Sequence, residues 1–278
     1  MRILTLLLAL LFTFGGISAQ NRRLARAVWP DTLDIAKLEV LYEFSRPEET
    51  DHSVREKGED ILIIGEKVSA YMRYGYYRSD SVFIKKKMVE GPRDFVWKTT
   101  FDYDRPSLKT AKVYKYYYKN EMEVVQSVSY NPFSFEEPLG KISWKILDEE
   151  KSILGYNCKK AEGTFRGRIW DVWYTEELNV ADGPWKLNGL PGLILEAVDR
   201  TGQLAFRAFG IRKSDGGIVY KDKFSKPAKT TYPKFRKQFK AYHSNPIAYY
   251  QSLPNSSKGG GFAKQTKKDY VYLELEDE

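Results

Sequence analysis

Cysteine and histidine, which supply most zinc ligands and many nucleophilic sites, are nearly missing from this chain of 278 residues. It contains one cysteine, Cys158, and two histidines, His52 and His243. A single cysteine excludes an internal disulfide, and in an exported protein such a residue is more often buried than reactive. Neither histidine stands at ligand spacing from another histidine or a cysteine, so the sequence predicts no metal site.

The sequence signatures of common enzyme classes are missing as well. There is no Gly-x-Ser-x-Gly elbow, phosphate-binding loop or dinucleotide fingerprint. The adjacent acids Glu136 and Glu137 stand near a proline, which is typical of a solvated loop. Asp171 is interpreted as an outward-facing residue paired with Arg168 or Lys186. We therefore expect a protein that is not an enzyme and binds no cofactor; a hydrolase whose site only a structure reveals is a third alternative.

The longest apolar run stands at the amino terminus. Arg2 precedes the apolar stretch Ile3 to Phe14, and small residues follow from Gly15 to Ala19. This order is that of a secretory signal peptide, and the run is shorter than the roughly 20 residues that cross a bilayer. We expect residues 1–19 to be a signal peptide and residues 20–278 to form a single exported domain, in the periplasm or at the outer membrane or cell surface.

Aromatic side chains are abundant. Hydrophobic residues make up 42% of the chain and aromatic residues 15%, and the 20 tyrosines outnumber the 15 phenylalanines. A tyrosine-rich composition favours β-sheet. The formal net charge is +8, and lysines cluster between Lys221 and Lys240. Export makes nucleic acid a poor partner, so this cluster indicates a solvated helix face or, at most, peripheral contact with an anionic membrane.

Strand patterns follow one another along most of the chain, joined by short turns. They cover Ala36–Phe44, Ile61–Ile64, Lys67–Tyr71, Val113–Tyr118, Glu121–Tyr130, Ile142–Ile146, Gly155–Phe165, Arg168–Tyr174, Leu193–Val198, Gln203–Arg212 and Ile218–Tyr220. Successive strands with short connections imply an antiparallel meander. We expect Tyr74 to Asp104 to be a loop with one helical turn or strand, Asn255 to Gly261 to be a linker, and Tyr270 to Leu275 to be a candidate last strand.

One amphipathic helix is predicted near the carboxyl terminus. Phe235, Phe239 and Tyr242 repeat at helical spacing after a threonine and a proline, and Asn245-Pro246 ends the pattern. The predicted fold class is therefore mainly β: an antiparallel meander forming a curved sheet or open half-barrel with one C-terminal amphipathic helix packed on it. This arrangement is similar to the half-barrel of outer-membrane lipoprotein carriers, as is the style of the hairpin around Ile153 to Cys158.

The strongest local backbone signal is the six-residue signature Gly189-Leu190-Pro191-Gly192-Leu193-Ile194. Proline followed by glycine fits the two central positions of a type II turn, so we expect Gly192 at positive φ. The following residues form a buried strand, and the turn at Asp199 to Gly202 leads into its return strand.

This signature and its surroundings resemble the GLPGLI family. The flanking segments that carry the resemblance are Ile153–Ala161, Phe165–Arg168, Trp173–Thr175 and Gly183–Lys186, together with Gly65, Ser69 and Tyr71. The resemblance implies a secreted or envelope protein of the Bacteroidetes type. The family has no established activity, so the resemblance implies no catalytic residues.

Two groups of residues are candidates for binding. Arg166 and Arg168 flank a hairpin turn and suit a phosphate or carboxylate, although two solvated arginines are an equally good interpretation. The aromatic candidates are Trp170, Trp173, Trp185, Phe235 and Phe239, which we expect to border an apolar groove roofed by the helix.

The predicted function is an exported cell-envelope binding or carrier module for a lipid-like or other hydrophobic ligand of unknown identity. The alternative is a non-catalytic interaction protein that serves an outer-membrane receptor system. An enclosed apolar cavity would favour the carrier, a flat apolar patch the interaction protein, and paired buried acids in a cleft an enzyme.

Overall fold

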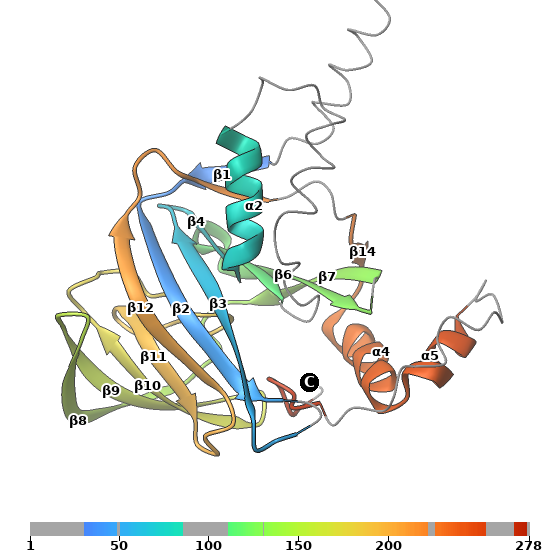
Figure 1. Ribbon diagram of the computed structural model, residues 1–278. Coiled ribbons are helices and arrows are strands. Elements are labelled where there is room, and N and C mark those ends of the chain that lie inside the picture. Colours follow the sequence, from blue (N-terminus) through green and yellow to red (C-terminus); the bar gives the residue numbers. More distant parts are fainter. Residues whose placement is uncertain are drawn as a thin grey trace, which may run out of the picture.

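The computed structural model describes residues 31–48, 51–85, 111–129, 131–221, 226–253 and 270–276. A large, twisted and curved β-sheet dominates these residues, with helices at its edge and on one face (Figure 1). The predicted signal peptide (1–19) and the predicted linker (255–261) lie outside the described residues.

The large sheet in the described part of the chain has 12 strands. They are β2 (Leu38–Pro47), β3 (Arg55–Ile64), β4 (Val68–Arg73), β5 (Lys112–Tyr116), β6 (Glu121–Val128), β7 (Asn131–Pro138), β8 (Trp144–Ile153), β9 (Tyr156–Phe165), β10 (Arg168–Thr175), β11 (Leu193–Asp199), β12 (Ala205–Lys213) and β14 (Ala228–Lys229). A separate two-stranded sheet pairs β1 (Asp31–Ile35) with β13 (Ile218–Lys221). The helical segments are α2 (Tyr74–Lys85), η1 (Tyr117–Lys119), α4 (Tyr232–Ser244) and α5 (Pro246–Ser252).

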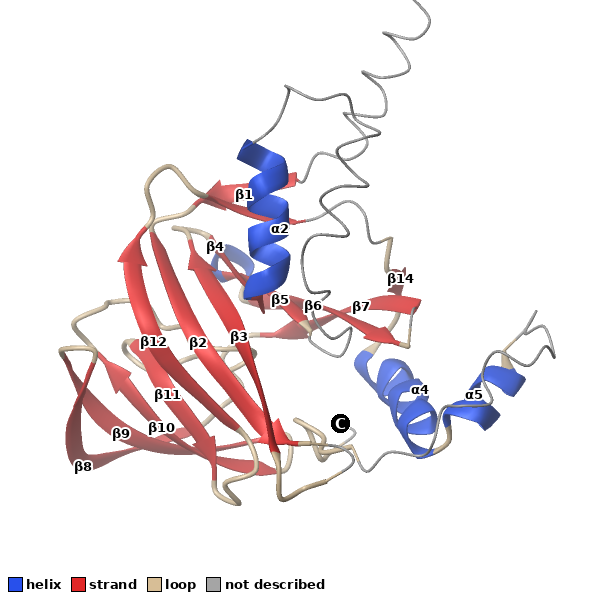
Figure 2. Ribbon diagram, viewed as in Figure 1, coloured by secondary structure: helices blue, strands red, loops and turns tan. Residues whose placement is uncertain are grey.

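Two antiparallel meanders make up the large sheet. Strands β2 to β7 pair in chain order towards one edge, and β8 to β12 pair in chain order from the other edge. The antiparallel pairing of β12 with β2 joins the two meanders, and β14 adds a short parallel pair to β7. The predicted fold class is confirmed, since the sheet is mainly antiparallel, curved and open, with helices near the C-terminus (Figure 2). Two helices, α4 and α5, stand where one was predicted.

Turn chemistry explains why the hairpins form where they do. Arg166 and Gly167 have φ of 51° and 76°, and Leu154 and Gly155 have φ of 53° and 86°. Two consecutive left-handed residues give a turn whose twist matches that of the flanking strands. The predicted turn at Arg166-Gly167 is confirmed.

Each face of the sheet carries an apolar core. The inner face carries the larger apolar core, which includes Val40, Tyr42 and Phe44 of β2 and reaches Phe235 and Phe239 of α4. The outer face carries a smaller core, to which β3 contributes Ile61 and Ile63. All six residues of β4 are buried, as expected for a strand with apolar cover on each side. Helix α2 lies in front of β3 and β4 on this outer side (Figure 1).

Two local predictions are wrong. Residues 74–85 form helix α2 rather than a loop with one helical turn or strand, because Tyr74, Tyr76 and Tyr77 pack on the smaller core. The rest of that predicted loop, residues 86–104, lies outside the described residues. Tyr270 to Leu275 does not join the sheet, because arginine side chains bind its backbone instead. No helix in the described ranges is long and apolar enough to cross a membrane.

Candidate functional site

The segment between β10 and β11, which carries the signature, fills much of the space on the inner face of the sheet. Trp185, Leu187 and Leu190 of this segment are buried in the larger core. They occupy part of the space where the sequence predicted an open apolar groove. The segment is therefore part of the hydrophobic core on the inner face of the sheet. Hydrogen bonds and ion pairs of its polar residues hold it against the neighbouring strands.

Asp182 ties this segment to β4 and β5. Lys115 donates to one Asp182 oxygen and to the carbonyl oxygen of Gly183 (2.7 Å), and the Lys115 and Asp182 side chains are both 0% exposed. Ser69 (2.5 Å) and Tyr117 donate to the other Asp182 oxygen. Burial lowers the pKa of Lys115, and Asp182 opposes this effect. A buried pair whose polar atoms are all bonded positions the chain rather than reacting with a ligand.

The two signature glycines have different roles. Gly189 has a φ of 94°, in the left-handed region that favours glycine. Gly192 is not in that region, so the predicted type II turn with Gly192 at positive φ is wrong. Instead, a Cβ at Gly192 would lie 2.1 Å from the carbonyl oxygen of Thr175. The pairing of Thr175 with Leu193 at the start of β11 brings the two backbones together, and only glycine fits there.

Lys186, in the same segment, pairs with two carboxylates. It donates to Glu137 of β7 and to Glu274 (2.7 Å), and Arg166 also donates to Glu137. Burial would raise the pKa of Glu137, but the charges and hydrogen bonds of Lys186 and Arg166 outweigh it and lower that pKa. The prediction that Glu136 and Glu137 lie in a solvated loop is wrong, because both lie on β7; Glu136 is exposed, whereas the Glu137 side chain turns inward and is buried.

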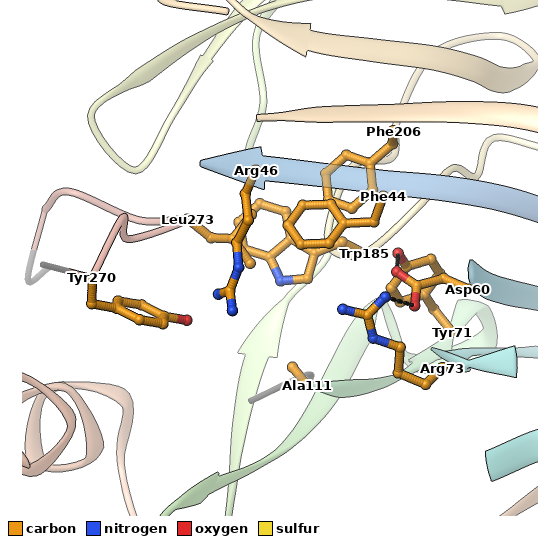
Figure 3. A pocket seen from close by; sticks show the side chains of 10 residues that line it. All are labelled: Phe44, Arg46, Asp60, Tyr71, Arg73, Ala111, Trp185, Phe206, Tyr270 and Leu273. Carbon is orange, nitrogen blue, oxygen red and sulfur yellow. Dashed lines mark hydrogen bonds and ion pairs between the residues drawn. The ribbon is translucent and has the colours of Figure 1, made fainter. Parts of the chain in front are cut away.

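A pocket opens on the inner face beside this segment (Figure 3). It is lined by Phe44, Arg46, Asp60, Tyr71, Arg73, Ala111, Trp185, Phe206, Tyr270 and Leu273. The side chains of Arg46, Arg73 and Tyr270 point towards the same space, in front of the aromatic rings (Figure 3). The cavity encloses about 20 Å³, which is room for about one water molecule.

Asp60 is the buried acid of this pocket. Tyr71 donates to its Oδ2, and the Arg73 guanidinium lies 3.3 Å from its Oδ1. Oδ1 has no hydrogen-bond partner among the described residues. Burial raises the pKa of Asp60 to about 6, against the opposing effects of Arg73 and Tyr71. Gly58 leaves room for Arg73, because a Cβ there would lie 1.6 Å from the guanidinium.

The raised pKa of Asp60 predicts a pH-dependent stability. Between about pH 4 and about pH 6 the folded protein keeps a proton on Asp60 that the unfolded chain has released. The contribution of Asp60 to folding therefore becomes less favourable as the pH rises through this window, by roughly 3 kcal/mol. Urea unfolding should show Asp60→Asn gaining stability relative to the wild type over that range. A difference that stays constant with pH would contradict the raised pKa.

The aromatic candidates do not form one site. Trp170 and Trp185 lie 6.2 Å apart between ring centroids on the inner face, and only Trp185 of the five lines the pocket. Phe235 and Phe239 point into the larger core from α4. Trp173 lies on the other side of β10, with the Lys151 ammonium 4.4 Å from its ring.

The two arginine candidates bind groups of the chain itself. Arg166 pairs with Glu137, and Arg168 donates to Asp199 (2.8 Å). Asp171 faces outward as interpreted, but its partner is Arg200 (3.3 Å) rather than Arg168 or Lys186.

Cys158 is free and buried, and burial raises the pKa of its thiol. Within the described ranges, no three potential metal ligands come together.

Sequence reasoning missed the charged residues of the pocket. Arg46 and Arg73 each follow an aromatic residue, Phe44 and Tyr71, by two positions on a strand. That spacing puts arginine and aromatic side chains on the same face. An arginine on the core-facing side of a strand was therefore the sequence signal that could have indicated the pocket. Only the fold brings β2, β3 and β4 together with Trp185.

Comparison with known proteins gives one family match. Residues 102–232 match the N-terminal domain of an N-glycanase peptide. The matched range includes the whole signature. This match contradicts the expectation that the protein is not an enzyme, because the matched domain is described as part of an N-glycanase. The resemblance to the GLPGLI family stays a prediction.

Solved structures give distant similarities. Two structures of PNGF-II, in different space groups, each share 20% identity with this chain at a TM-score of 0.48, over 73% of this chain and 32% of theirs. A LolA-superfamily protein from Nitrosomonas europaea shares 8% identity at a TM-score of 0.26, over 70% of this chain and 93% of its own. The chain thus spans about a third of the length of PNGF-II. None of the curated proteins compared matches it.

Proposed function

We propose that this chain is an exported recognition module that binds the saccharide of a glycopeptide at the pocket around Asp60. The matched family description, an N-glycanase peptide, supports N-linked glycan as the ligand class. Export to the cell envelope, predicted from residues 1–19, is part of the proposal.

The observation that carries the proposal is the chemistry of the pocket. Aromatic rings offer flat apolar faces against which the C–H groups of a sugar ring pack. Arg46 and Arg73 pair with Glu56 and Asp60, and these charged groups place planar donors and an acceptor at the pocket, which suit the paired hydroxyl groups of a sugar. With a volume of about 20 Å³, the pocket takes one hydroxyl group while the ring lies across its mouth.

The same geometry favours a saccharide over the lipid-like ligand predicted from the sequence. Pockets for small organic ligands usually have about 300 Å³ or more and mostly apolar walls. Here two guanidinium groups and a carboxyl group face a much smaller space. Trp185, Leu187 and Leu190 occupy inner-face space that an acyl chain would need.

Trp185 provides the readout that tests this function. Because Trp185 lines the pocket, the tryptophan fluorescence of the protein, to which five other tryptophans also contribute, is expected to change saturably on titration with an N-linked glycopeptide or with N,N′-diacetylchitobiose. Asp60→Asn is expected to weaken binding at least about tenfold, the effect of losing roughly 1.4 kcal/mol of interaction. Asp171→Asn is the matched control, since it makes the same chemical change on the outer face and should leave affinity unchanged.

The outcome that contradicts the proposal is equal affinity in Asp60→Asn, Asp171→Asn and the wild type. Saturable binding of a fatty acyl probe without binding of either saccharide would favour the carrier instead. Melting temperatures of both variants show whether a lost signal reflects unfolding.

A further inference from the structure

The last described residues, Tyr270 to Glu276, form an irregular segment with a bend at Leu273, which lies against α4 and the turn between β9 and β10. We call this segment the C-terminal strap. It is not a strand of the sheet, yet it is well held: Tyr270, Val271 and Glu274 are buried. It therefore has the form of a peptide lying in a groove.

The backbone of the strap is bound by side chains rather than by a neighbouring strand. Three of its carbonyl oxygens accept hydrogen bonds: Tyr272 from Arg168 (3.0 Å), Glu274 from Arg236, and Glu276 from Tyr232 (3.0 Å). The Leu275 amide donates in turn to the carbonyl oxygen of Arg166 (2.8 Å). These hydrogen bonds involve the backbone of the strap, so they would bind the backbone of a peptide with other side chains in the same way.

Alternate side chains of the strap supply the sequence preference. The Tyr270 ring stacks on His243, with 3.9 Å between the centroids, and the Arg46 guanidinium lies 5.2 Å from it. The Tyr272 ring lies 4.5 Å from the Arg236 guanidinium. The segment bends at Leu273, and Tyr270 and Tyr272 both lie before this bend.

A carboxylate follows the bend. Glu274 accepts a hydrogen bond from Lys186 (2.7 Å), and the Arg166 Nε lies 3.9 Å away. Glu137 already pairs with both of these cations, so they remain partnered when the strap leaves.

The groove beneath the strap is cationic. Arg166, Arg168, Lys186 and Arg236 line it, and Glu137 and Asp199 are the carboxylates that pair with them among the described residues outside the strap. Without the strap the groove carries an excess of positive charge. Gly167 adds room, since a Cβ there would lie 3.0 Å from the side chains of the strap.

We propose that this groove is a recognition site for an acidic peptide with the pattern Tyr-x-Tyr-x-Glu, and that the C-terminal strap is the copy of that ligand carried by the chain itself. Peptide recognition in general combines backbone hydrogen bonds with pockets for alternate side chains, as here. Tyr270 and Leu273 also line the pocket around Asp60, so an incoming peptide that displaces the strap removes one wall of that pocket.

A labelled synthetic peptide with the sequence of residues 270–278 tests the proposal. It is titrated by fluorescence anisotropy against the full chain carrying Tyr270→Ser, Tyr272→Ser and Glu274→Gln, which weaken the strap in place. We expect saturable binding at least about tenfold tighter than to the wild-type chain, where the tethered strap competes at an effective concentration on the order of millimolar. Added salt should weaken the binding.

The control peptide carries lysine in place of the residue corresponding to Glu274 and should bind at least about tenfold more weakly, because it puts a cation beside Lys186 and Arg166. Equal binding of the two peptides, or equal binding to the variant and wild-type chains, would overturn the proposal.

If the triple variant fails to fold, the proposal is tested on the wild-type chain by amide hydrogen exchange. The Leu275 amide is expected to exchange faster as the unlabelled peptide is added, because displacement of the strap breaks its bond to Arg166. No change at millimolar peptide would overturn the proposal. Saccharide binding is measured separately, by tryptophan fluorescence without added peptide, so failure of this proposal and failure of the proposed function are distinguishable.

Discussion

Replacing Gly192 with alanine is expected to destabilise the protein by about 3 kcal/mol, at the upper end of the usual cost of overpacking. The new Cβ would lie 2.1 Å from the carbonyl oxygen and 2.6 Å from the carbonyl carbon of Thr175. Both are backbone atoms, so they move only if the start of the β10–β11 pair separates. Urea unfolding of the purified variant measures the loss.

Gly189→Ala is the matched control, because it changes the other glycine of the signature in the same way. Its φ of 94° makes alanine strained, at a cost of roughly 1–2 kcal/mol, but the nearest neighbour of its Cβ is 3.8 Å away. We expect the smaller effect there. If Gly192→Ala proves as mild as Gly189→Ala, the close approach to Thr175 does not constrain the fold.

Lys115→Met is expected to destabilise the protein by roughly 3–5 kcal/mol, the usual cost of removing one partner of a buried ion pair. Asp182 would remain fully buried with its charge uncompensated, and the Gly183 carbonyl oxygen would lose a donor. The signature segment should loosen with it, so the fluorescence of Trp185 is a second measurement besides urea unfolding.

Two further variants serve as controls for the effect of Lys115→Met. Adding Asp182→Asn to Lys115→Met should recover part of the loss, since it removes the unpaired charge. Lys57→Met, which breaks an exposed pair with Glu43, should cost less than about 1 kcal/mol. A Lys115→Met variant as stable as Lys57→Met would show that the Asp182 network does not hold the segment in place.

Local patterns were sufficient for most strands and turns. The turn at Arg166-Gly167 depends on which residues tolerate positive φ, and this is a property of the residues themselves. Helix α4 was predictable in the same way, because Phe235 and Phe239 repeat at helical spacing and both are buried. In each case the signal and the structure lie within a few residues of each other.

Local sequence patterns gave wrong predictions where contacts with residues distant in the chain determine the structure. Helix α2 depends on the smaller core that receives Tyr74 and Tyr77. The C-terminal strap reads as a strand, yet Arg168 and Arg236 bind its carbonyl oxygens in place of a neighbouring strand. The sequence pattern explained the glycine at position 192 by a positive φ. In the structure, glycine is required there because the backbone of Thr175 lies too close for a Cβ atom.

The sequence by itself therefore determined the mainly β class, the order of the hairpins and the position of α4, because alternation, turn residues and helical spacing act over short distances. Only the tertiary structure decided that the signature segment fills the inner face and that Asp60, Arg46 and Arg73 meet Trp185 in one pocket. These contacts join residues more than 100 positions apart, and their charges and burial exist only once β2, β3 and β4 have paired. Whether Asp60 is a surface carboxylate or a buried acid with a raised pKa is thus a property of the fold and not of its neighbours in the chain.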